Sequence, residues 1–170
     1  AIAVLALKRS ILTEKISRRG RHISQEFSVD PLALGMAADL MTRDPETLPE
    51  TMTIAEARHF FETSASHQTY PVVDGDHHPI GLAARRDALR WRQLDDEQGT
   101  ALGDLLSDRS LPVVTPDTPA DAIANLMIRN EVGRICVVSP EDGRLLGIIS
   151  RRDLLQSRAA VLRGEVERAR

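Results

Sequence analysis

Residues 147–153 read GIISRRD, and residues 81–87, earlier in the chain, read GLAARRD. The two segments share a glycine, two apolar residues, two arginines and an aspartate in the same order, at an offset of 66. Upstream, an offset of 65 aligns VV at residues 72–73 with VV at 137–138, and DLMT at 39–42 with DLLS at 104–107. Register kept over so many positions indicates an internal duplication, and we interpret the chain as two related units.

Each unit predicts the same order of elements. A short extended segment precedes a helix with a capping signature: Thr53 with Glu56 in the first unit, and Thr118 as cap with Pro119 at the first helical position in the second. Two apolar runs joined by a polar turn then predict a hairpin, and a second helix follows. These segments are residues 47–49, 70–73, 79–83 and 85–93 in the first unit, and 112–115, 135–138, 145–149 and 151–160 in the second.

The predicted fold class is α+β, with two β-α-β-β-α units packed sheet to sheet about a pseudo-twofold axis. A unit of about 55 residues buries too little apolar surface to be stable alone. We therefore expect the two units to share a core and to leave clefts where they meet.

The composition excludes several classes of protein. Hydrophobic residues make up 42% and charged residues 28% of the 170-residue chain, as in ordinary soluble proteins. Cys136 is the single cysteine, which suits a reducing compartment, and its apolar neighbours predict burial. The sequence has no Gly-rich phosphate loop, nucleophile elbow or zinc pattern, so we expect no enzyme activity. Few aromatic residues and an acidic globular part make nucleic acid a poor partner.

Ser150 and Asp153 carry the chemistry of the repeated segment. They place a hydroxyl and a carboxylate three residues apart at a predicted helix N-terminus, where free amide groups attract anions. A carboxylate in that position can accept hydrogen bonds from a ribose diol. The same spacing is also a capping box, so a purely structural role is the alternative.

The doubled pattern Gly-hydrophobic-hydrophobic-Ser/Thr-x-x-Asp resembles the cystathionine-β-synthase (CBS) domain family over residues 37–160. The resemblance implies that Asp153 binds the ribose of an adenosine ligand, that Ser150 lies near its phosphates, and that the base lies between the units. In the first unit Ala84 replaces the hydroxyl, so a ligand is less expected there. The residues expected to contact ATP, ADP or AMP are Thr47, His67, Gln68, Ser150, Arg152 and Asp153.

A second resemblance concerns the N-terminal segment. RSILTEKISRRG at residues 9–20 and FSVDPL at 27–32 are similar to the linker between the membrane domain and the CBS pair of bacterial CLC-type chloride channels and transporters. The apolar residues 1–7 and their basic flank are typical of the cytoplasmic end of a membrane span. We therefore expect a membrane-span end and juxtamembrane linker at residues 1–36, CBS domains at 37–100 and 101–162, and a tail at 163–170.

These resemblances leave three functional hypotheses. The first is a regulatory module on the cytoplasmic side of the cell membrane, in a homodimeric chloride channel or chloride/proton antiporter, where an adenine nucleotide shifts the coupling to the membrane domain. The second is a purely structural dimerisation module. The third is the CBS pair of a magnesium transporter or a metabolic enzyme.

The polar turn at residues 74–78, DGDHH, has no spaced partner ligands, so no metal is expected.

Overall fold

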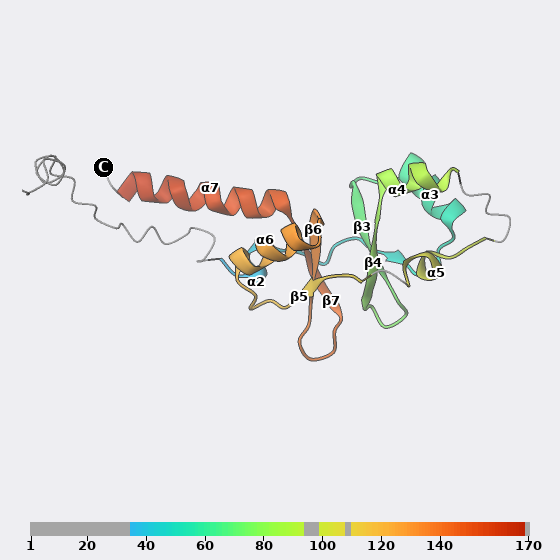
Figure 1. The fold of residues 1–170 in the computed structure, drawn as a ribbon, viewed down its shortest axis with the longest axis horizontal. Helices are drawn as coiled ribbons and strands as arrows, with labels where there is room; N and C mark the ends of the chain where they lie inside the picture. Colours follow the sequence, from blue (N-terminus) through green and yellow to red (C-terminus); the bar gives the residue numbers. More distant parts are fainter. Residues whose placement is uncertain (1–34, 94–98, 108–109, 169–170) are drawn as a thin grey trace, which may run out of the picture.

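The structure is a computed structural model that describes residues 35–93, 99–107 and 110–168. Two small sheets lie beside each other, each with its own helices (Figure 1). One sheet has the strand order β2-β3-β4, and the other has the order β1-β7-β6-β5. The fold is therefore α+β with two related units, as the duplication predicts.

The first unit is built around a parallel pair and a hairpin. Strand β2 runs parallel to β3, and β3 pairs antiparallel with β4. Its core combines Tyr70 and Phe61 with aliphatic side chains and with Trp91 at the end of α4. The elements are β2 (Leu48–Pro49), α3 (Ile54–Thr63), β3 (Thr69–Val73), β4 (Pro79–Ala84), α4 (Arg85–Trp91) and α5 (Leu102–Leu106).

The second unit repeats this plan with one additional strand. Strand β5 runs parallel to β6, β6 pairs antiparallel with β7, and β1 adds to the free edge of β7. Ile123, Ile135 and Ile149 lie fully buried in its core. The elements are α2 (Ala37–Leu40), β1 (Thr42–Arg43), β5 (Val113–Val114), α6 (Ala120–Arg129), β6 (Arg134–Val138), β7 (Leu145–Ser150) and α7 (Arg151–Arg168).

The two units exchange the segments that precede them, which the sequence analysis did not predict. Segment α2–β1 comes before the first unit but packs on the second, where Thr42 pairs with Ile148. Segment α5 comes before the second unit but packs on the first, where the Leu102 amide donates to the Met52 carbonyl at 2.8 Å. Gly147 permits the first crossing, because a Cβ there would lie 2.8 Å from the Thr42 carbonyl oxygen. The repeats DLMT and DLLS mark these two exchanged segments.

The helix starts confirm one predicted cap and correct the other. In α3 the Thr53 amide donates to Glu56 Oε2 at 2.9 Å and the Glu56 amide donates to Thr53 Oγ1 at 3.2 Å, so the capping box is present. The prediction for α6 was wrong by one residue, because Pro119 is the N-cap and the helix begins at Ala120. Thr118 Oγ1 instead accepts from the Thr115 amide in the preceding turn.

The helix that follows the GIISRRD segment is longer than predicted. Helix α7 continues from Arg151 to Arg168 instead of ending near residue 160. Its C-terminal part extends away from the second unit (Figure 1). Residues 161–168 contain leucine, glutamate and arginine, which favour helix, and the helix continues through Gly164 although glycine is a weak helix former.

The sheets meet through a small apolar cluster. Val73 from the first unit packs with Cys136 and Leu145 from the second. Burial raises the pKa of the Cys136 thiol to about 12, which leaves little reactive thiolate near neutral pH. The predicted sheet-to-sheet packing and the burial of Cys136 are both confirmed.

Candidate functional site

Two cavities lie along the seam between the units. The first, which we call the acidic cleft, has a volume of about 430 Å³. Three carboxylate side chains line it, Asp44, Glu46 and Asp153, against the single guanidinium of Arg134. Its volume lies within the range of small-molecule sites, and its walls come from both units.

The acidic cleft brings together four of the six residues that the sequence analysis proposed. His67 and Gln68 reach it from the segment before β3, and Ser150 and Asp153 from the junction of β7 and α7. Thr47 and Arg152 are absent from its lining. Their contact with a ligand, like that of the other four, stays a prediction.

Asp153 both caps a helix and keeps an oxygen available. Its Oδ2 accepts from the Ser150 amide and from Ser150 Oγ, each at 2.7 Å, so the capping box is present. Within the described residues, Oδ1 accepts no hydrogen bond. The cap fixes the orientation of the carboxylate, and Oδ1 remains able to accept from a hydroxyl in the cleft.

The opposite wall of the acidic cleft is fixed by Tyr70. The Tyr70 ring is buried, and its hydroxyl accepts a hydrogen bond from the His67 amide at 2.9 Å. The Gln68 carbonyl in turn accepts from the Arg85 amide at 3.0 Å. These backbone bonds hold the segment in place, while the exposed side chains of His67 and Gln68 stay free to contact a ligand.

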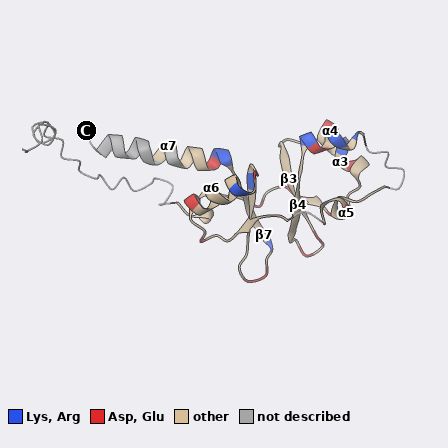
Figure 2. Ribbon diagram, viewed as in Figure 1, with Lys and Arg blue, Asp and Glu red and all other residues tan. Residues whose placement is uncertain are grey.

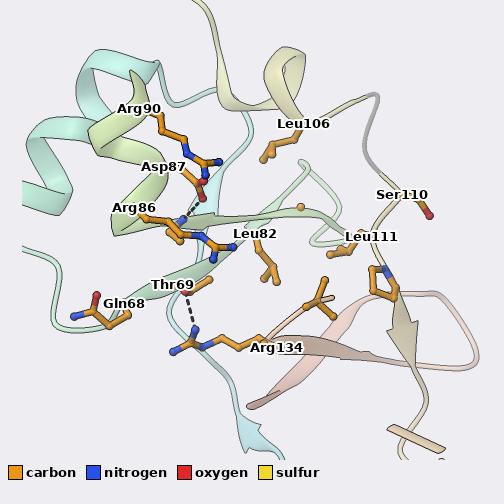
Figure 3. Close-up of a pocket in the computed structure, with 15 residues that line it drawn as sticks. Gln68, Thr69, Leu82, Arg86, Asp87, Arg90, Leu106, Ser110, Leu111 and Arg134 are labelled. Carbon is orange, nitrogen blue, oxygen red and sulfur yellow. Dashed lines mark hydrogen bonds between the residues drawn. The ribbon is translucent and has the colours of Figure 1, made fainter. Parts of the chain in front are cut away.

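The second cavity, which we call the arginine cleft, has a volume of about 390 Å³. Arg86 and Arg90 on α4 and Arg134 on β6 line it, as Figure 3 shows. Within the described residues, the side chains of Arg86 and Arg90 take part in no hydrogen bond or ion pair. Asp87 Oδ2 accepts from the Ala84 amide at 3.0 Å, which repeats the cap of Asp153 without the hydroxyl.

Arg134 lies between the two cavities. Its Nη1 donates to Thr69 Oγ1 at 2.9 Å, and both residues line the acidic cleft and the arginine cleft. Each repeat also begins its second helix with two arginines, seen in blue at the starts of α4 and α7 (Figure 2). The sequence did not predict Asp44, Glu46 and Arg134 as site residues, because their positions depend on strand pairing and not on a local motif.

Residues 37–93 and 102–160 each match the model of the CBS domain family. The chain belongs to this family. It is a tandem CBS pair, as its doubled motif indicates, and CBS domains of this kind are regulatory modules. The further resemblance to the CLC-type linker concerns residues 9–32, which lie outside the described residues.

Relatives of the CBS pair occur in proteins of different functions. An A-adding tRNA nucleotidyltransferase of Geobacter sulfurreducens is 34% identical over 120 residues, which are 71% of this chain and 13% of that protein. The cytosolic domain of the Mg²⁺ channel MgtE, solved with ATP, is 27% identical with a TM-score of 0.58, over 71% of this chain and 48% of that one. The CBS domain of a bacterial CNNM/CorC Mg²⁺ transporter, also solved with ATP, is 16% identical with a TM-score of 0.65, over 77% and 92%.

The chain spans 13% to 41% of the length of these curated relatives. Among the residues that the structure describes, no helix has the length and apolar character needed to cross a bilayer. Over the same residues, no three His, Cys, Asp or Glu side chains gather as a metal site would require.

Proposed function

We propose that this CBS pair is a regulatory module that binds an adenine nucleotide in the acidic cleft. The observation that carries the proposal is that Asp153, whose Oδ1 accepts no hydrogen bond within the described residues, lines a cavity whose other wall belongs to the first unit. Asp153 would accept hydrogen bonds from the ribose hydroxyls, and the segment at His67 and Gln68 would contact the base. The ATP complexes of the two similar transporter structures support this ligand class.

Such a ligand would act by joining the two units. A molecule that contacts both walls stabilises the arrangement in which the walls are correctly spaced, and it shifts the population toward that arrangement. The size of the shift is set by the difference in affinity for the two arrangements, commonly about 1–3 kcal/mol.

The charges of the acidic cleft favour a ligand with few phosphates. Asp44, Glu46 and Asp153 repel phosphate groups, and Arg134 alone opposes them. The phosphates would therefore lie toward Arg134, on the side shared with the arginine cleft. We expect AMP to bind more tightly than ATP when no divalent cation is present to neutralise the additional charge.

The test is isothermal titration with ATP, ADP and AMP of the wild type and of two matched variants, Asp153→Ala and Asp87→Ala. Each variant loses one helix cap, at Ser150 and at Ala84 respectively, so both carry a similar stability cost. We expect Asp87→Ala to keep wild-type affinity, and Asp153→Ala to lose at least about tenfold because a charged acceptor is removed.

Wild-type affinity in Asp153→Ala would exclude the proposed site. Absence of heat with all three nucleotides, together with an unchanged Tm, would exclude nucleotide sensing in this chain.

We further propose that the module is the cytoplasmic regulatory part of a CLC-type chloride channel or chloride/proton antiporter. The resemblance of residues 9–32 to the linker of those proteins supports this origin. The occurrence of similar CBS domains in two membrane transport proteins is compatible with it. Chloride flux through the parent protein in liposomes, measured with and without AMP or ATP, tests the assignment. A parent that carries Mg²⁺ or has enzyme activity would contradict it.

Self-association is a second candidate function, and it is compatible with the first. Leu89 on α4 and Leu155 on α7 occupy equivalent positions of the two repeats, and their exposed fractions are 61% and 67%. Ile128 on α6 is 71% exposed. Large apolar side chains on helices of both units favour a second copy of the chain as the partner.

We expect a dimer in sedimentation experiments on the wild type and a monomer for the double variant Leu89→Arg/Leu155→Arg. Because both side chains are exposed, the substitutions should leave the Tm of the dilute protein nearly unchanged. A wild type that remains monomeric at high concentration would rule out this role. The double variant of the neighbouring exposed positions Arg90→Ala/Gln156→Ala serves as a control and should remain dimeric.

A further inference from the structure

His78 joins the two units through both nitrogens of its ring. Its Nδ1 lies 3.0 Å from Asp74 Oδ2, within the turn that connects β3 and β4. Its Nε2 lies 2.8 Å from the backbone carbonyl oxygen of Asp142, in the turn that connects β6 and β7. Both partners are acceptors. A neutral imidazole carries one N–H and can donate to only one of them, whereas the imidazolium donates to both.

The rest of the contact holds the two turns side by side. The Leu145 amide donates to the His77 carbonyl at 3.0 Å, and Arg144 Nε donates to the Asp76 carbonyl at 2.8 Å. Gly143 has a φ of +74°, and a Cβ there would lie 3.4 Å from the His78 ring. The glycine therefore gives the opposite turn a backbone conformation that lets the His78 ring approach closely.

The charged groups around His78 favour its protonated form. Its own turn contributes the carboxylates of Asp74 and Asp76, and the opposite turn contributes the backbone carbonyl of Asp142 as a hydrogen-bond acceptor. Arg144 is the cation of the opposite turn, and its Nε is bonded to the Asp76 carbonyl. The hydrogen bond to Asp74, followed by that to the Asp142 carbonyl, raises the pKa of His78. The same turn geometry lowers the pKa of Asp74, first through the His78 amide, so the carboxylate stays charged.

We propose that His78 is a proton-operated latch between the two CBS units. The imidazolium ties the β3–β4 turn to the β6–β7 turn, and loss of its proton removes one of the two hydrogen bonds. The latch lies at the Val73 end of β3, whereas the acidic cleft lies at the Thr69 end. Loss of the His78 proton therefore weakens the contact between the two units at the end of the sheets that lies opposite the acidic cleft. The latch does not require a bound nucleotide.

The direction of the pH dependence follows from the raised pKa of His78. The stabilisation is complete below the pKa of an unfolded histidine, about 6.5. It is lost as the pH rises through the higher pKa of the folded state. The inter-unit contact should accordingly be tightest at mildly acidic pH and looser at alkaline pH.

The test follows the exchange of the Leu145 amide in the wild-type chain between pH 5.5 and 9, together with an NMR titration of the His78 ring. The protection factor, which already corrects for the intrinsic pH dependence of exchange, should fall about twofold to tenfold as His78 loses its proton. Amides of the β3–β4 ladder within the first unit should show no such change.

Two variants complete the experiment. His78→Asn should remove the pH dependence of the Leu145 protection factor, because an amide side chain does not titrate. His77→Asn, at the adjacent position whose backbone φ of +71° asparagine tolerates, should keep it. A protection factor that does not change with pH in the wild type would overturn the latch. The latch would also be overturned if the Leu145 protection factor of His78→Asn depended on pH as strongly as that of the wild type. If His78→Asn fails to fold, the titration and exchange of the wild type still decide the question.

Discussion

Tyr70→Ala will lower the free energy of unfolding by about 3–5 kcal/mol, the range for removing a buried aromatic ring. Tyr70 is 1% exposed, and its ring makes edge contacts with Phe60 and Phe61 at centroid distances of 5.0 and 5.7 Å. The loss combines a cavity in the first unit with the removal of these aromatic contacts. Urea unfolding followed by circular dichroism measures the change.

Tyr70→Phe separates the ring from its hydroxyl. The ring contacts remain, while the His67 amide loses its acceptor, so the expected loss of unfolding free energy is about 1–2 kcal/mol. That hydrogen bond also holds one wall of the acidic cleft in place. We therefore expect Tyr70→Phe to lower nucleotide affinity as well, although it changes the free energy of unfolding only slightly. If Tyr70→Ala and Tyr70→Phe cost the same, the ring would not be the main source of stabilisation.

Gly147→Ala is expected to lower the free energy of unfolding by about 3 kcal/mol, the upper part of the range for overpacking. The added Cβ would lie 2.7 Å from Met41 Sδ and 2.8 Å from the Thr42 carbonyl oxygen. The sulfur can move, but the carbonyl belongs to β1, so relief requires β1 to separate from β7. The Asp44 amide donates to the Leu146 carbonyl at 3.2 Å, and this part of the acidic cleft should move with β1.

Two other glycines provide the controls for this prediction. At Gly81 the three atoms nearest to the added Cβ all belong to the side chain of Leu106, with Cδ1 at 2.8 Å, and this side chain can move, so Gly81→Ala should cost less. At Gly75 nothing lies within 4 Å, and Gly75→Ala should be neutral or slightly stabilising. Thermal unfolding of the three variants gives the order. Equal Tm values for Gly147→Ala and Gly75→Ala would show that β1 pairing is not a stabilising part of the fold.

The sequence predicted the local elements better than the way they assemble. Hairpins and helix caps depend on neighbouring residues, so the β6–β7 hairpin and the Thr53 cap could be read directly. The exchange of α2–β1 and α5 could not, because nothing within DLMT or DLLS specifies which unit each segment will contact. The start of α6 was misplaced for a similar reason. The Ala120 amide donates to the carbonyl of Gly35, which is distant in sequence.

The same distinction applies to the candidate site. Ser150 and Asp153 belong to one local motif, and their cap follows from spacing alone. Their position opposite His67 and Gln68 was implied by the family resemblance, and the structure places all four along one cavity. Asp44 and Glu46 enter the cleft only because β1 pairs with β7, a contact between residues more than a hundred positions apart. The acidic character of the cleft was therefore not predictable from composition or motif.

The exchanged segments also determine how the chain can fail. Strand β1 completes the sheet of the second unit, and α5 closes the core of the first, so each repeat contains part of the other. A substitution that destabilises one repeat also displaces a segment that packs on the other repeat. The other repeat is therefore destabilised as well. We therefore expect the two units to unfold together, and we expect a fragment with one repeat alone to lack a segment that completes its sheet or core.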